Sequence, residues 1–163
     1  DIICWLDSDL YNCSKTLDKM TDILKKNKDY DIIIGSKYVT NGKDTRSVIR
    51  RFASKFISTY SRILFGFDIK DYISGFVALR KEVFNKVKIY QYGYTEYYID
   101  FIVQCKKFGF KIKEVGYIDK ERKSGVSKTV PNILDFLNYG FILVIWLFKL
   151  KLGLITNKYR KKL

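Results

Sequence analysis

Two aspartates near the start of the chain are spaced for metal chemistry. Asp7 and Asp9 flank one serine and follow the apolar run DIICWL, residues 1–6. Such a run is typical of a buried strand in a parallel sheet, with polar side chains at its carboxyl end. Two carboxylates there can both reach a hard divalent cation, Mg²⁺ or Mn²⁺, which can neutralise the diphosphate of a bound nucleotide. Alone the triplet is a weak signal, because two aspartates in a loop are most often solvated turn residues.

Other familiar catalytic centres do not fit the composition. The chain contains no histidine, so a His-based catalytic triad is impossible. Cys4, Cys13 and Cys105 lack the CxxC spacing of a zinc site, and we expect free thiols of the kind found in a reducing compartment. Nothing at the start of the sequence reads as a signal peptide.

The net charge of +14 predicts attraction to polyanions, which include nucleic acid, anionic lipid and phosphorylated substrates. Charge alone does not choose among these, but no helix-turn-helix, zinc or RNP-type motif supports nucleic acid, so we expect no nucleic-acid partner. With 47% hydrophobic residues and no convincing linker, the 163 residues are expected to form one compact domain.

The order of the elements predicts an α/β fold. Residues 1–6, 14–28 and 31–35 read as strand, helix and strand, which gives a βαβ unit. A turn at Asn41-Gly42 follows, and residues 47–65 form an amphipathic helix whose cationic face suits an anionic membrane surface. A strand at 75–80, a short helix at 81–86, a helix at about 95–108 and a strand at 110–118 complete the pattern.

The segment from Ile133 to Ile155 is strongly apolar but is interrupted by charges, and Pro131 is placed to open a helix there. Because the apolar stretch is shorter than a spanning helix needs, we favour an interfacial or re-entrant helix over a transmembrane one. The basic tail KYRKKL would anchor either form to anionic lipid on the cytoplasmic side of a membrane. A buried core helix is the alternative.

Six motifs in order resemble the family 2 glycosyltransferases of the dolichyl-phosphate mannose synthase and polyprenyl-phosphate glycosyltransferase type. The first three are DSDL at 7–10, DIIIGSKY at 31–38, and the Arg50-Arg51 pair with Ser54. The block DYISGFVALRKEVF at 71–84, the strand GFKIKEV at 109–115 and ERKSGVSK at 121–128 complete the series. Six ordered motifs are far more specific than any one of them.

The resemblance implies a nucleotide-diphospho-sugar transferase fold (GT-A, Rossmann-like) with amphipathic membrane-facing helices, in which Asp7 and Asp9 hold the metal and act in catalysis. It also implies a set of residues that bind substrate and its phosphates: Lys37, Arg51, Asp71, Ser74, Gly75, Arg122, Ser127 and Lys128. A polyprenyl phosphate has an anionic head, for which arginine offers bidentate hydrogen bonds and lysine a point charge. Lys37 stands where the family's GSRY motif has arginine, so the charge is kept and the bidentate fork is lost.

The family places a first βαβ unit and the residues that read the nucleotide base before the DxD strand. The fold is therefore expected to be incomplete at its N-terminus. Residues 1–130 would form the C-terminal portion of the catalytic domain, and residues 131–163 a membrane-associated apolar helix and basic tail.

The implied reaction is an inverting transfer of a hexose, mannose or glucose, from a GDP- or UDP-sugar to a dolichyl or other polyprenyl phosphate. A phosphate acceptor is already ionised near neutral pH, so the transfer needs no dedicated general base. With a glycan or other alcohol as acceptor, Asp100 or Glu96 would be the candidate base. A catalytically inactive membrane-binding remnant is a further alternative.

Overall fold

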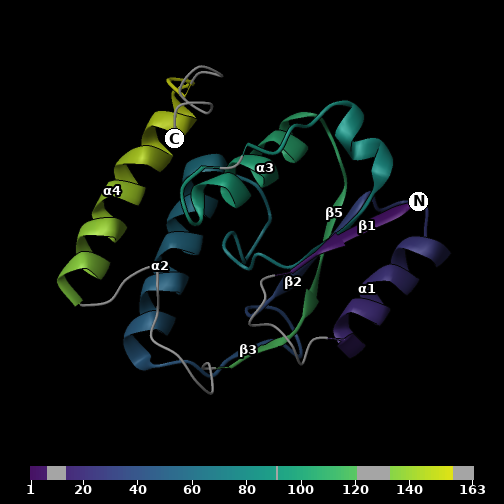
Figure 1. The fold of residues 1–163 in the computed structure, drawn as a ribbon, viewed down its shortest axis with the longest axis horizontal. Helices are drawn as coiled ribbons and strands as arrows, with labels where there is room; N and C mark the ends of the chain where they lie inside the picture. Colours follow the sequence, from purple (N-terminus) through teal and green to yellow (C-terminus); the bar gives the residue numbers. More distant parts are fainter. Residues whose placement is uncertain (7–13, 91, 121–132, 156–163) are drawn as a thin grey trace.

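The structure is a computed structural model that describes residues 1–6, 14–90, 92–120 and 133–155 (Figure 1). The strands of its main sheet are β1 (Ile2–Trp5), β2 (Ile32–Ser36), β4 (Val77–Arg80) and β5 (Ile112–Gly116). A small second sheet pairs β3 (Lys43–Asp44) with β6 (Ile118–Asp119). The helices are α1 (Ser14–Lys26), α2 (Val48–Phe65), α3 (Glu96–Lys107) and α4 (Ile133–Lys151), with a 3-10 turn η1 (Lys81–Asn85). The predicted α/β class is confirmed.

The main sheet has the order β1-β4-β2-β5 and mixes parallel and antiparallel pairs. β2 pairs parallel with β5, while β4 pairs antiparallel with both β1 and β2. Val77 of β4 is therefore opposite Trp5 on one side and Ile34 on the other. The predicted βαβ unit is present: β1 and β2 run in the same direction, and α1 connects them along the chain. A strand from much later in the chain lies between them, and local sequence patterns contain no sign of that insertion.

The carboxyl ends of β1, β2 and β5 meet at one edge of this sheet. Because these three strands run in the same direction, Trp5, Ser36 and Gly116 all lie toward that edge. Open α/β sheets bind ligands outside the carboxyl ends of their strands. The topology therefore predicts a ligand site at this carboxyl edge.

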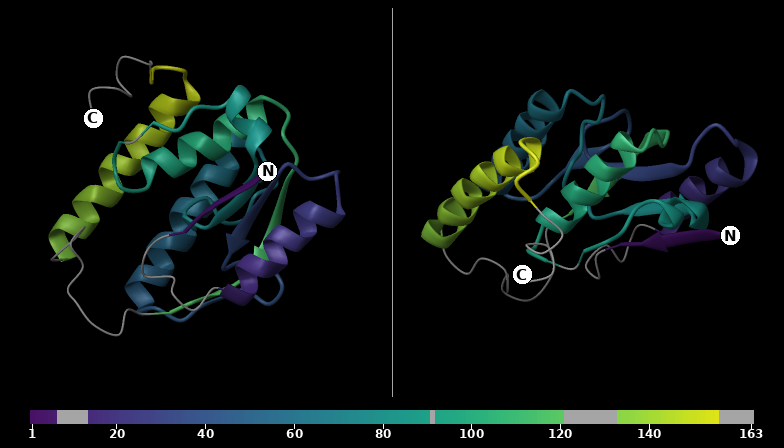
Figure 2. Two further views of the ribbon diagram at one scale, coloured as in Figure 1. Left: turned by 45° about the vertical axis from the view of Figure 1, so that its right-hand side comes forward. Right: turned by 90° about the horizontal axis from the view of Figure 1, so that it is seen from above.

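The two faces of the sheet are covered by different helices. Ile33 of β2 packs with Met20 and Leu24 of α1, whereas its neighbours Ile32 and Ile34 join the core formed with α2, α3 and α4. This division follows from the alternation of side chains along a strand. Figure 2 shows α1 on one side of the sheet and the other three helices on the opposite side.

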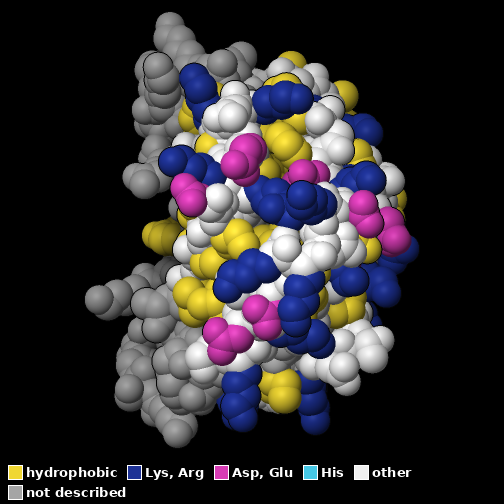
Figure 3. All heavy atoms as spheres, turned by 90° about the vertical axis from the view of Figure 1, so that its right-hand side faces the viewer, with side chains coloured by type: hydrophobic (Ala, Val, Ile, Leu, Met, Phe, Trp, Pro, Cys, Tyr) yellow, Lys and Arg dark blue, Asp and Glu magenta, His cyan; other side chains and the backbone are white. Residues whose placement is uncertain are grey.

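The basic residues are not gathered in one stripe on the side of the molecule that carries α1. Figure 3 shows lysine and arginine side chains there mixed with acidic and apolar ones. Helix α1 itself alternates in this way, with Lys15 and Lys19 beside Asp18 and Asp22. Among the residues drawn in colour, the positive charges therefore do not form a continuous cationic surface over this side.

Helix α4 is buried along one face and exposed along the other. It lies beside α2 (Figures 1 and 2), and Leu143, Trp146, Leu147 and Leu150 are buried in the core between them and α3. Phe141, Ile145 and other apolar residues of its opposite face are exposed. Among the helices that the structure describes, none combines the length and apolar character needed to cross a bilayer.

At Gly116, the last residue of β5, the backbone lies so close to the turn at residues 40–42 that a side chain has no room. A Cβ atom at this position would meet the carbonyl oxygen of Thr40 and would lie 2.5 Å from the amide nitrogen of Gly42, so the turn at 40–42 would have to move. We expect Gly116→Ala to lower the free energy of unfolding by about 1–3 kcal/mol, the usual cost of overpacking. Urea denaturation measures this loss.

The matched control is Gly140→Ala in α4, where the added methyl group meets no atom of the described residues within 4 Å apart from the backbone of its own helix. A helical glycine is about 0.5–1 kcal/mol less favourable than alanine, so this variant should be slightly more stable than the parent. Equal effects of the two substitutions would contradict the close approach at Gly116.

Candidate functional site

A buried ion pair stands at the carboxyl edge of the sheet, directly after β2. The ammonium of Lys37 lies 3.0 Å from Oδ2 of Asp71, and both side chains are almost completely buried. The backbone N–H of Lys37 donates to the same oxygen at 2.9 Å, and its ammonium also donates to the Tyr117 hydroxyl at 3.3 Å. Lys37 is therefore tied to the segment that leads into β4 and to the residue that follows β5.

Asp71 also orders the loop that follows it. Its Oδ1 accepts a hydrogen bond from the N–H of Ile73, and its own N–H donates to Glu114 of β5 at 3.0 Å. Glu114 accepts a second bond from the N–H of Lys70, and burial is the main cause that raises its pKa. Asp71 thus connects the residue that follows β2 with β5 at this edge.

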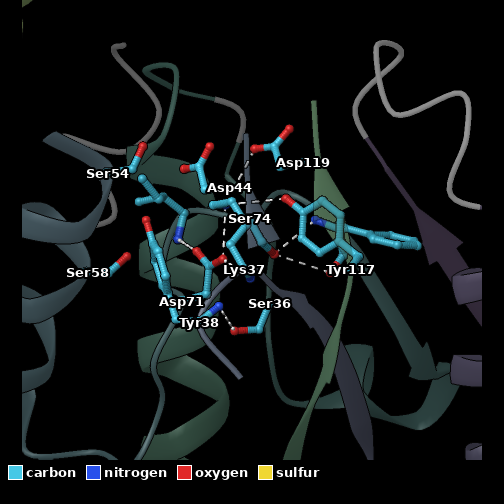
Figure 4. A network of polar contacts seen from close by, with 12 residues as sticks. Ser36, Lys37, Tyr38, Asp44, Ser54, Ser58, Asp71, Ser74, Tyr117 and Asp119 are labelled. Carbon is cyan, nitrogen blue, oxygen red and sulfur yellow. Dashed lines mark hydrogen bonds and ion pairs between the residues drawn. The ribbon is translucent and has the colours of Figure 1, made fainter. Parts of the chain in front are cut away.

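The rest of that loop is held from α3. Ser74 shares a hydrogen bond of 3.0 Å with the hydroxyl of Tyr98, and its Oγ accepts from the N–H of Phe76 at 3.3 Å. Gly75 has a φ of +64°, a conformation that favours glycine. The predicted binding residue Ser74 is therefore held in place beside Lys37 and Asp71 (Figure 4), and Gly75 follows it in the chain.

A second group of charges adjoins the first, and Figure 4 shows two of its members, Asp44 and Asp119, near Lys37. Arg46 forms a two-point contact with Asp44, at 2.9 Å from Nε and 2.7 Å from Nη2, and its Nε lies 3.2 Å from Asp119. Asp119 is also 3.9 Å from the Lys37 ammonium, which joins the two groups into one network. This network combines a residue that follows β2, one from the loop before β4, and residues in or directly after the paired strands β3 and β6.

The electrostatic effects within the network follow from burial and charge. Burial, which disfavours the charged form, is the main cause that raises the pKa of Asp119, and the charges of Asp44 and Asp71 add to it against the opposite effect of Arg46 and Lys37. Burial alone would also raise the pKa of Asp44, but the hydrogen bonds and charge of Arg46 hold it below its usual value. Burial raises the pKa of Tyr117, with Asp119 and Asp71 contributing, so this phenol stays protonated.

The two carboxylates considered as general bases are both engaged. Asp100 of α3 is buried, and its Oδ2 accepts a hydrogen bond from the hydroxyl of Tyr92 at 3.0 Å. Glu96 accepts the N–H groups of residues 94 and 95 and, at 2.7 Å, the hydroxyl of Tyr139 in α4. Glu96 thus helps to attach α4 to the α3 side of the fold.

Two curated relatives match most of the chain. The polyprenol monophosphomannose synthase of Mycolicibacterium smegmatis is 33% identical over 131 residues, which are 78% of this chain and 48% of that protein. The dolichol-phosphate mannosyltransferase of Pyrococcus furiosus is 31% identical over 150 residues, 90% of this chain and 41% of that protein. The chain belongs to the family of these mannosyltransferases. It spans about half the length of each of the two.

Solved structures support the fold. The glucosyl-3-phosphoglycerate synthase of Mycobacterium tuberculosis, in complex with Mn²⁺, UDP and glucosyl-3-phosphoglycerate, matches with a TM-score of 0.63 at 15% identity. The match covers 94% of this chain and 50% of that one. The predicted nucleotide-sugar transferase (GT-A) fold is therefore confirmed, although no protein-family model matches the chain.

Several predicted site residues lie outside the described part of the chain: Asp7, Asp9, Arg122, Ser127 and Lys128. Arg51 is described and lies exposed on α2. Among the predicted residues within the described ranges, Lys37, Asp71, Ser74 and Gly75 come together, while Asp100 is held in α3 by its bond to Tyr92. The proposed roles of all these residues in binding and catalysis remain predictions.

Sequence reasoning missed Asp44, Arg46, Tyr117 and Asp119. Asp44 and Arg46 occur in a polar stretch that reads as an ordinary loop, and Asp119 begins a segment rich in charges. The available signal in the sequence was the pair of opposite charges two residues apart, Asp44 and Arg46. Such pairs are common in solvated loops and do not by themselves indicate a buried site. The pairing of β3 with β6, across more than seventy residues, is what buries these side chains.

Proposed function

We propose that this chain is the catalytic and acceptor-facing part of an inverting glycosyltransferase that moves a hexose from a nucleotide sugar to a polyprenyl phosphate. The names of the two relatives contain mannose and polyprenol or dolichol phosphate. These names favour mannose as the transferred sugar, and we propose a GDP- or UDP-linked donor. The solved neighbour binds UDP on the same fold. The names of the two relatives support a phosphate acceptor, and the solved neighbour supports a nucleotide-sugar donor.

The observation that carries the proposal is the common edge of the parallel strands. Lys37 follows β2 at the carboxyl edge, Tyr117 follows β5, and the chain leaves β1 toward the same edge only two residues before Asp7. Phosphates of donor and acceptor would thus bind near residues that enter from separate parts of the sequence. Holding two reactants in one place is a large part of catalysis of this kind.

The donor set fits a divalent cation. Asp7 and Asp9 would hold Mg²⁺ or Mn²⁺, since hard oxygen ligands suit both ions, and the neighbouring structures contain Mn²⁺ or Mg²⁺ with UDP. Such an ion would neutralise charge on the donor diphosphate as it leaves. Arg51, Arg122 and Lys128 would orient the acceptor phosphate, whose own oxygen attacks the anomeric carbon without transferring a proton.

An alcohol acceptor is the second candidate, because a solved neighbour binds its UDP-sugar together with phosphoglyceric acid. In that case Asp100 would be the base. Its carboxylate is buried and accepts the Tyr92 hydroxyl, so substrate would have to displace that bond before a proton could be taken up.

The decisive experiment incubates the chain with radiolabelled GDP-mannose or UDP-glucose, a polyprenyl phosphate and Mg²⁺ or Mn²⁺, then partitions the products between water and organic solvent. We expect label in the organic phase, sensitive to mild acid and absent after chelation. Label in a water-soluble glycan would favour the alcohol acceptor. No transfer from either donor would favour an inactive membrane-binding remnant.

We also propose that the chain works at a membrane surface, on its cytoplasmic face, with α2 and α4 toward the lipid. Phe52 of α2 is 75% exposed and Phe141 of α4 is 66% exposed, and further exposed apolar residues accompany them on both helices. Arg51 and Lys55 of α2 are exposed among these side chains. Apolar residues mixed with cations are typical of helices that lie in a bilayer interface.

Phe52→Ser tests the membrane proposal. Because a fully buried phenylalanine contributes about 1.5–3 kcal/mol, loss of the ring should weaken binding to phosphatidylglycerol-containing vesicles roughly tenfold. Co-sedimentation measures the change. Phe108→Ser removes an exposed ring at the end of α3 and should leave vesicle binding unchanged. Equal losses in the two variants would contradict docking through α2.

A further inference from the structure

Asp119, the last residue of β6, is held by the segment that contains β3. The backbone N–H of Thr45 donates to its carbonyl oxygen at 2.8 Å, and the Thr45 hydroxyl donates to the same oxygen at 2.9 Å. The Nε of Arg46 lies 3.2 Å from its carboxylate. Backbone and side chain of one residue are therefore fixed by two consecutive residues of a distant segment.

Arg46 is itself fixed in one orientation. Its guanidinium makes the two-point contact with Asp44, and its Nη2 also donates to Oγ of Ser54 in α2 at 2.8 Å. Only 21% of the Arg46 side chain is exposed. A planar guanidinium with several N–H donors can bond to Asp44 of β3, Asp119 of β6 and Ser54 of α2 at the same time. A lysine ammonium cannot make these contacts with the same geometry.

The charges of the network make Arg46 hard to replace. Asp44, Asp71 and Asp119 contribute three carboxylates, against the two cations Lys37 and Arg46. Lys37 lies close to Asp71, at 3.0 Å, and far from Asp119, at 3.9 Å. Among the described residues, Arg46 is therefore the cation in close contact with both Asp44 and Asp119, and its loss would leave two carboxylates in mutual repulsion.

We propose that Arg46 is a positioning residue for the acceptor phosphate. By holding Asp119 and Ser54 together, it sets where the chain leaves β6 and how the first half of α2 lies against it. In the sequence only Lys120 separates the end of β6 from ERKSGVSK, and Arg51 precedes Ser54 by three residues on α2. The inference rests on the proposed function, since it concerns the segments from which the predicted acceptor-binding residues come.

The test compares Arg46→Met, Arg46→Lys and Arg80→Met in the transfer assay with varied donor and varied polyprenyl phosphate. Misplacement by about 1 Å can cost as much as a hundredfold, so we expect Arg46→Met to raise the acceptor KM roughly tenfold or more and the donor KM by less than about twofold. Arg46→Lys should recover only part of the loss, since it restores charge without the fork.

Arg80→Met is the matched control. Arg80 ends β4 at the opposite edge of the sheet and donates to the carbonyl oxygens of Leu24, Asn27 and Tyr30, so its loss also removes several hydrogen bonds. It should lower stability while leaving the ratio of the two KM values unchanged. An unchanged acceptor KM in folded Arg46→Met, or the same KM pattern in both variants, would overturn the proposal.

Hydrogen exchange separates this inference from the function itself. The N–H groups of Lys43 and Thr45 donate to Tyr117 and Asp119, and their exchange should accelerate in Arg46→Met but not in Arg80→Met. If the parent chain transfers no sugar, the proposed function fails, and exchange at these two amides still decides whether Arg46 holds β6. Unchanged exchange there would overturn the positioning role whatever the activity.

Discussion

Replacing Lys37 with methionine is expected to lower the free energy of unfolding by about 3–5 kcal/mol, the usual cost of removing one partner of a buried ion pair. The reason is the environment of Asp71, whose side chain is fully buried and whose Oδ2 lies 3.0 Å from the Lys37 ammonium. Without the ammonium, a carboxylate would remain in the protein interior, and within the described part of the chain the backbone N–H groups of Lys37 and Ile73 would be left to stabilise its charge. Urea denaturation, with the m-value checked for constancy, measures the loss.

Two variants control this experiment. Lys37→Met combined with Asp71→Asn removes both charges, and should recover a good part of the stability lost in the single variant. Lys81→Met breaks an exposed pair with Asp1, in which the side chains are 65% and 83% exposed, and should change stability by less than about 1 kcal/mol. Similar losses in Lys37→Met and Lys81→Met would show that the Lys37 pair is accessible to solvent.

This arrangement bears on the predicted phosphate contact of Lys37. Its ammonium already has Asp71 and Tyr117 as partners, so a substrate phosphate would compete with them for it. Lys37→Arg, which restores the residue usual in the family motif, provides the comparison. A lower KM for either substrate in Lys37→Arg would support direct binding, whereas unchanged KM values would favour a role in holding the edge together.

Replacing Asp9 with alanine is expected to reduce sugar transfer by roughly 100-fold or more, because several kcal/mol of charge stabilisation at the leaving diphosphate depend on the metal that Asp7 and Asp9 would hold. Since Asp9 follows the strand β1 in the sequence and is expected to act through a metal ion, folding should be largely preserved. The rate of label transfer into the organic phase measures the effect, with thermal unfolding measured in parallel.

Asp18→Ala is a suitable control for Asp9→Ala, because it removes an exposed carboxylate from α1 and should leave transfer unchanged. Removal of divalent cations by a chelator should abolish transfer by the parent chain, and added Mg²⁺ or Mn²⁺ should restore it. Transfer by Asp9→Ala at the parental rate would contradict the metal site, even if the function in lipid-phosphate glycosylation were correct.

Much of the fold could be predicted from local patterns. The helix expected at 47–65 is observed as Val48–Phe65, and the strand expected at 31–35 as Ile32–Ser36. The Asn41-Gly42 turn is present, with Asn41 at a φ of +66°. These elements follow from periodicity and turn chemistry, which act over a few residues and can therefore be read from the sequence.

The part of the site that depends on distant pairing could not be predicted. Lys37 was expected as a phosphate ligand, and nothing in GSKY indicates that its ammonium is buried against Asp71, 34 residues away. In the sequence, Arg46 and Asp119 are indistinguishable from charged residues of solvated loops. The pairing of β3 with β6 is what buries them. Burial of a charged side chain depends on what packs over it, and that is a property of the whole fold.

The sequence by itself determined the class of fold, the family and the presence of a carboxylate pair after the first strand, because short-range spacing and ordered motifs carry that information. Only the tertiary structure decided that β4 lies between β1 and β2, that α4 is half buried beside α2, and that two cations and three carboxylates form one network. Contacts between residues far apart in the chain depend on the sum of many weak interactions, so no single segment of the sequence specifies them.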